Sequence, residues 1–123
     1  MREIKFRFWL ANNHEPRMHY FDLRDEDLNF RAIIDRGSVL LQYTGLKDKN
    51  GVEIYEGDIV NITTNWISDL APDKPPTTST KAVEFVKGSF QLGHGGFFSN
   101  GFIERGELEV IGNIYENNEL LNV

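Results

Sequence analysis

The sequence predicts a mainly β fold, either a small barrel or a strongly bent antiparallel sheet, with at most one or two short helices. Three observations support this prediction. Apolar residues recur mostly with a period of two, which is typical of half-buried strands and not of amphipathic helices. Turn sequences rich in Gly, Asn and Asp separate these segments. A chain of 123 residues is also long enough for one core, because a protein of this size buries about two-thirds of its extended surface. We therefore expect one domain over residues 1–123.

The N-terminal segment predicts a β-hairpin. Within Glu3–Trp9, the apolar residues Ile4, Phe6 and Phe8 alternate with charged ones, so these three are expected to face the core. A polar break follows, and Met18–Leu23 is expected to form the second strand.

The next segment, Arg24–Gly37, is ambiguous. Its first half keeps a period of two and its second half breaks it, so a strand is favoured only slightly over a short helix. Val39–Thr44 again has the composition of a strand.

Two tight turns are expected in the middle of the chain. Asn and Gly tolerate positive φ, and an Asp side chain can bond backbone amides two residues further on. The turn residues are Asp48, Asn50, Gly51, Gly57 and Asp58. A Gly-Asp turn before an Ile-Val strand often opens a strand in small SH3-like barrels, so Ile59–Thr63 is expected to begin an SH3-like second half.

A Pro- and Thr-rich surface loop is expected at about residues 65–80, because this segment offers little to bury. Lys81–Leu92 then alternates loosely, with Gly88 at a turn or bulge. Glu109–Tyr115 is expected to be the last strand, and Glu116–Leu121 a capped turn or one short helical turn.

Composition excludes several kinds of site. The formal net charge is 13 − 19 = −6, and the absence of cysteine excludes disulfides, thiolate metal sites and cysteine nucleophiles. No apolar run reaches the roughly 18 residues of a membrane helix, and the N-terminus does not resemble a signal peptide. His14, His19 and His94 lack metal-ligand spacing, and we expect no metal and no cofactor.

Three blocks of sequence resemble the YopX family, small proteins encoded mostly by phages and prophages. The blocks are the opening Met1–Arg7, the central Tyr43–Gly51 with Ile54–Val60, and the closing Val110–Asn117. The resemblance implies a cytoplasmic, β-rich phage protein of unassigned biochemical role, and it supplies no catalytic residues.

The chain departs from the family pattern at three positions. Phe8 and Leu10 stand where Ala and Asp are expected, which adds apolar bulk to the opening strand. Asn118 stands where Pro is expected, which weakens a Pro-started helical turn.

Exposed aromatic residues give the first functional hypothesis. Phe97, Phe98 and Phe102 lie on a glycine-rich loop, and Trp66 lies beside the Pro-rich loop. Exposed aromatic patches mark interfaces, although the loop could instead fold back on the core as a lid. We therefore expect a non-enzymatic accessory protein that binds a protein partner, either a host protein or itself as a homo-oligomer.

A nucleic-acid-binding module is the alternative. If Ile4 and its even-numbered neighbours face the core, then Lys5, Arg7 and Trp9 share the opposite face, with Arg17 nearby. Aromatic rings that stack on bases, next to cations that hold phosphates, are typical of single-strand binding. The global negative charge opposes this reading.

A hydrolase is the second alternative. Glu53, Glu56 and Asp58 cluster around one turn, and paired carboxylates are a common hydrolytic arrangement. Such residues more often cap turns, so we expect no enzymatic activity.

Overall fold

The computed structural model describes residues 3–11, 16–22, 31, 37–64, 73, 75, 77–93 and 107–121. These residues form two four-stranded antiparallel sheets. The first sheet has the order β2-β1-β3-β4, with the bounds β1 Lys5–Leu10, β2 Arg17–Asp22, β3 Val39–Lys47 and β4 Glu53–Tyr55. The second has the order β7-β6-β5-β8, with the bounds β5 Asp58–Thr64, β6 Thr77–Val86, β7 Ser89–Leu92 and β8 Leu108–Asn113. A 3₁₀ turn, η1 (Asn118–Leu121), follows β8. The predicted mainly β fold with bent antiparallel sheets and an N-terminal hairpin is confirmed.

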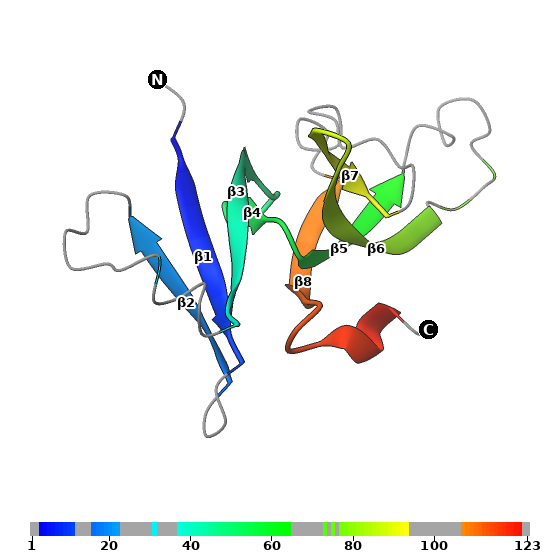
Figure 1. Ribbon diagram of the computed structural model, residues 1–123. Coiled ribbons are helices and arrows are strands. Elements are labelled where there is room, and N and C mark those ends of the chain that lie inside the picture. The colour runs from blue at the N-terminus through cyan, green and yellow to red at the C-terminus, as the bar shows by residue number, and fades with distance from the viewer. Residues whose placement is uncertain are drawn as a thin grey trace.

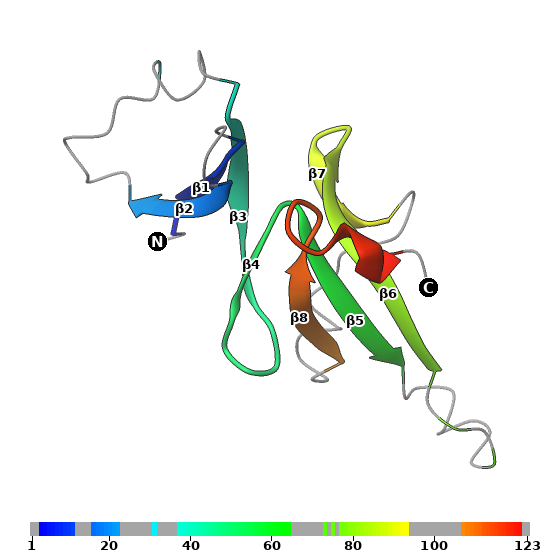
Figure 2. The same ribbon diagram turned by 90° about the horizontal axis from the view of Figure 1, so that it is seen from below.

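The two sheets lie next to each other, with β3 and β4 between the β1–β2 hairpin and the second sheet (Figures 1 and 2). The chain passes from one sheet to the other at the short turn between β4 and β5. The β4 residue Ile54, which is fully buried, joins the core cluster of the second sheet. Burying a side chain of this size stabilises the fold by roughly 1.5–3 kcal/mol, so this cluster helps to hold the sheets together.

The hydrophobic core has two parts. The cluster around the second sheet contains Ile54, Val60, Ile62, Val83, Leu92 and Leu108. In the first sheet the core is more aromatic: the ring of Phe8 lies 5.3 Å from that of Phe21, and Tyr43 lies 5.4 Å from Tyr55. Ile4, expected to face this core, is 47 % exposed instead, because it precedes the first paired residue of β1.

The strand boundaries differ from the expectations at two places. The expected loop at about residues 65–80 ends earlier, because Thr77–Thr80 belong to β6 and pair with β5. The Thr80 hydroxyl donates to the Asn61 carboxamide at 2.7 Å, and β-branched threonines suit a strand, so the segment pairs despite its loop-like composition. The sequence also did not indicate β4, which has only three residues.

Several expected segments fall largely outside the described residues. These are most of Arg24–Gly37, the start of the Pro- and Thr-rich segment, and the glycine–aromatic segment after β7. The β6–β7 turn is described: Lys87 and Gly88 both have positive φ, 52° and 84°, as a type I′ two-residue hairpin turn requires.

Candidate functional site

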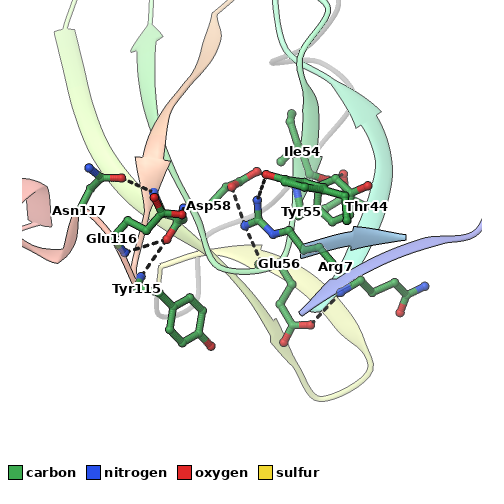
Figure 3. Close-up of polar contacts among 12 residues, drawn as sticks. Arg7, Thr44, Ile54, Tyr55, Glu56, Asp58, Tyr115, Glu116 and Asn117 are labelled. Atoms are coloured by element: carbon green, nitrogen blue, oxygen red, sulfur yellow. Dashed lines mark hydrogen bonds and ion pairs between the residues drawn. The ribbon is translucent and has the colours of Figure 1, made fainter. Parts of the chain in front are cut away.

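A buried ion pair connects the two sheets. Arg7 extends from β1 toward the start of β5, where its Nη2 donates to Asp58 Oδ1 at 2.7 Å (Figure 3). Both side chains are only 3 % exposed. The same guanidinium donates to the Glu56 carbonyl oxygen at 3.3 Å and to the Tyr20 hydroxyl at 3.2 Å. Arg7 therefore bonds the N-terminal hairpin to the turn that starts the second sheet.

Two tyrosine rings surround this guanidinium. Its central carbon lies 4.8 Å from the Tyr55 ring centroid and 5.7 Å from that of Tyr20. The two rings meet edge to face, with centroids 5.5 Å apart. Burial, with a smaller contribution from the charge of Glu53, raises the pKa of Tyr55 to about 12, so its hydroxyl stays protonated. The rings offer π faces that stabilise a cation withdrawn from water.

Asp58 also caps its own turn. Its Oδ2 accepts a hydrogen bond from the Tyr55 amide at 2.7 Å. Burial raises the pKa of Asp58, and the Arg7 charge and the Tyr55 amide oppose this effect. The carboxylate is thus a buried structural partner, closed off from solvent on the side of Arg7.

The expected exposed basic face on β1 is wrong at Arg7. Phe8 packs against the His19 and Phe21 rings on one face of β1, while the other face turns Arg7 toward the second sheet. Because both faces are covered at this point, Arg7 is not free to bind phosphate.

The other residues of the proposed nucleic-acid surface are not grouped around an open patch. Lys5 forms ion pairs with Glu53 at 2.6 Å and Glu3 at 3.3 Å, and the hydrogen bond to Glu53 raises the pKa of Lys5. The Trp9 ring stacks on Tyr115, with centroids 5.4 Å apart. Arg17 is exposed at the start of β2.

The three candidate catalytic carboxylates have different partners. Glu53 pairs with Lys5, Asp58 pairs with Arg7, and Glu56 Oε1 accepts from the Gln42 amide at 3.4 Å. Burial raises the pKa of Glu56. The three carboxylates are close in sequence, but each side chain bonds to a different partner.

The Asp48 turn is bonded to the last strand. Asp48 Oδ1 accepts from the Asn50 and Val52 amides, both at 2.9 Å, and Oδ2 accepts from the Val110 amide of β8 at 2.9 Å. Gly51 in the same turn has φ 81°. The Asp-Lys-Asn-Gly segment therefore fixes β8 as well as its own turn.

The closing sequence block forms a second such turn. Asn113 Oδ1 accepts from the Tyr115 and Glu116 amides at 3.0 and 2.9 Å. Asn117 Oδ1 accepts from the Asn113 amide at 3.2 Å (Figure 3). A Cβ at Gly112 would lie 2.5 Å from that same Oδ1, so any side chain at position 112 would clash with Asn117.

An aromatic pair on the second sheet was not expected to be a site. The Phe85 ring is 49 % exposed and meets Phe90 edge to face, with centroids 5.1 Å apart. Two grooves meet at Phe85. One, of about 470 Å³, is lined by Gln42, Tyr43, Thr44, Phe85, Gly88, Ser89 and Phe90. The other, of about 350 Å³, is lined by Leu41, Glu56, Gly57, Val83, Glu84, Phe85, Val86, Ile114 and Tyr115.

A signal for this surface was present in the sequence. Phe85 and Val86 are adjacent, so a strand through both places apolar side chains on its two faces. One of the two had to face either solvent or another part of the molecule.

The aromatic residues first expected to bind a partner, Trp66, Phe97, Phe98 and Phe102, lie outside the described residues. The same is true of His14 and His94. His19 is exposed on β2, with its ring 4.9 Å from that of Phe8. Among the residues with described positions, no three His, Asp or Glu side chains gather as metal ligands would. Nor does this part of the chain contain a helix of the length and apolar character needed to cross a membrane.

Comparison with known proteins gives a family and a fold. The family model described as YopX protein matches residues 5–122. Among solved structures, the chain is similar to the crystal structure of protein EF1440 from Enterococcus faecalis, with 27 % identity and a TM-score of 0.56. That match covers 96 % of this chain and 97 % of the other. No curated protein matches the chain.

Proposed function

Because the chain belongs to the YopX family, we propose that it is a phage- or prophage-encoded accessory protein, without catalytic activity, that binds a protein partner. One observation carries the proposal: Phe85 is half exposed, packs on Phe90, and stands between two grooves. An aromatic anchor beside grooves is typical of the centre of a protein interface.

The bonding of the acidic residues supports a non-catalytic role. A hydrolase needs two carboxylates that face one substrate. Here Asp58 is enclosed with Arg7, and Glu53 is held by Lys5 on the first sheet. Glu56 alone of the three lines a groove.

Pull-down from host-cell lysate tests the proposal with three forms of the tagged protein: wild type, Phe85→Ser and Val52→Ser. Val52 is 47 % exposed, close to the 49 % of Phe85, but lies on the Asp48 turn away from both grooves. We expect wild type and Val52→Ser to capture a host protein whose capture persists after nuclease treatment. We expect Phe85→Ser not to capture this protein. The melting temperature of Phe85→Ser should stay close to that of wild type, because the ring is already half in solvent.

Equal capture by all three forms would show that Phe85 is not the binding surface. Capture that disappears with nuclease would favour the nucleic-acid alternative. Replacing Phe97, Phe98 and Phe102 by Ser in the same assay tests the aromatic loop, and sedimentation of the wild type tests self-association.

A further inference from the structure

Within the described part of the chain, the β6 backbone is open on one side at Phe85. Gly93 N donates to Ala82 O at 2.8 Å, so Ala82 and alternate residues after it bond to β7. Val83 and Phe85 therefore direct their N–H and C=O groups to the opposite side, and Val83 O accepts from Gly57 N at 2.8 Å. At Gly57 the chain turns back toward β4, so β5 does not extend alongside Phe85. Among the described residues, no bond outside the sheet ladders reaches the Phe85 N–H or C=O, and the ladder alternation makes Phe85–Phe90 a non-hydrogen-bonded pair.

A groove runs along this open edge. The groove of about 350 Å³ contains β6 residues Val83 to Val86 on one side, and Leu41, Ile114 and Tyr115 on the others. Apolar side chains thus flank a main-chain donor and acceptor for which the described residues provide no partner. This combination suits an extended polypeptide, which adds to a sheet edge through main-chain hydrogen bonds and places alternate side chains in pockets.

The groove is also acidic, because Glu56 and Glu84 both line it. Among the residues with described positions, no Lys, Arg or His lines it. One Glu56 oxygen accepts from the Gln42 amide. Burial raises the pKa of Glu56, while the Gln42 amide and the Arg7 charge oppose this effect. Tyr115 lines the same groove as Glu56. Burial, with a smaller contribution from the charge of Glu56, raises the pKa of Tyr115. A long basic side chain matches these walls, since its stem is apolar and its end is a cation.

We propose that an extended segment of a partner protein adds to β6 at Phe85 and places an Arg or Lys side chain against Glu56. This inference rests on the proposed function and specifies the partner's binding segment. Main-chain bonds to Phe85 provide general affinity for an extended strand, and Glu56 selects for a basic residue.

Nuclear magnetic resonance of the ¹⁵N-labelled full chain tests this with three peptide probes. The first is acetyl-Val-Arg-Val-amide. The second replaces Arg by citrulline, which keeps the shape and removes the charge, and the third is methylated at every backbone nitrogen. We expect the first probe to shift the Phe85 amide resonance and slow its hydrogen exchange. The citrulline probe should bind at least fivefold more weakly, and the methylated probe should leave the Phe85 amide unprotected.

Two variants identify the acidic partner. Glu56→Gln keeps an oxygen that can accept from the Gln42 amide, so the fold should persist while the preference for Arg over citrulline disappears. Glu109→Gln removes an equal charge from β8, outside the groove, and should keep the preference.

The possible outcomes separate the two proposals. Equal affinity for the Arg and citrulline probes at Phe85 would refute the role of Glu56 and leave the protein-binding surface standing. Shifts that map elsewhere, or no binding of any probe, would overturn the strand addition, while the Phe85→Ser pull-down would still decide the proposed function. Slow hydrogen exchange of the Phe85 amide in the free protein would also overturn the strand addition, because the edge would then be covered by the chain itself. If that protection grew with protein concentration, a second copy would be the cover.

Discussion

Breaking the Arg7–Asp58 pair is the most severe single test of how the two sheets are joined. Arg7→Met leaves the Asp58 carboxylate, 3 % exposed, without its cation, and removes the bonds to Tyr20 and to the Glu56 carbonyl. Removing one partner of a buried pair costs about 3–5 kcal/mol. A domain of this size has a total stability of roughly 5–15 kcal/mol, so the variant should remain folded only within a narrow range of temperature.

A double-mutant cycle separates the pair from its surroundings. Asp58→Asn should be similarly destabilising, because it leaves the Arg7 charge buried without a counter-ion. The double variant Arg7→Met/Asp58→Asn has neither charge, so its loss of stability should be smaller than the sum of the two single losses by about 2 kcal/mol. Lys5→Met, which disrupts the more exposed pair with Glu53, serves as the control and should change the melting temperature little.

Thermal unfolding followed by circular dichroism at pH 7 measures these effects. At about 4 °C per kcal/mol for a chain of this length, each single variant at Arg7 or Asp58 should lower the melting temperature by about 12–20 °C. Hydrogen exchange should show faster opening of β1 and β2. A change below about 1 kcal/mol in either single variant, or strict additivity in the double, would refute the reasoning that this pair connects the sheets.

Three further predictions concern the turns and the groove. Asp48→Ala removes the acceptor of three backbone amides and should lower the free energy of unfolding, measured in urea, by about 3 kcal/mol. Asp48→Asn should lower it less, and equal stabilities of the two variants would contradict this reasoning. Gly112→Ala should cost about 1–3 kcal/mol by displacing Asn117, and combining it with Asn117→Ala should be less than additive. Burial raises the pKa of Glu56 above its ordinary 4.5, so its contribution to stability is present below pH 4.5 and is lost as the pH rises through the folded-state pKa. Glu56→Gln should therefore melt at a higher temperature than wild type at pH 7, with the difference vanishing toward pH 4.5; a lower melting temperature at pH 7 would oppose this.

Local patterns predicted much of the fold but not which residues meet across it. Alternation indicated strands near β1, β2, β3, β5 and β8, and turn chemistry located the bends at Asp48 and Gly57, since both signals depend on neighbours in sequence. Alternation also wrongly placed Arg7 on an exposed face. A period of two says which residues share a face and does not say what covers that face.

The sequence by itself determined a mainly β chain of the YopX family, with its tight turns and no cysteine chemistry. Only the tertiary structure decided that Arg7 reaches Asp58, 51 positions away, and that Asp48 bonds β8, 62 positions away. It alone decided that the pairing of β5 with β6 ends at Ala82, before Phe85, and that a groove lies there beside Glu56. These contacts depend on strand register and on how one sheet packs against the other. Local sequence patterns do not show contacts between residues that are far apart in sequence.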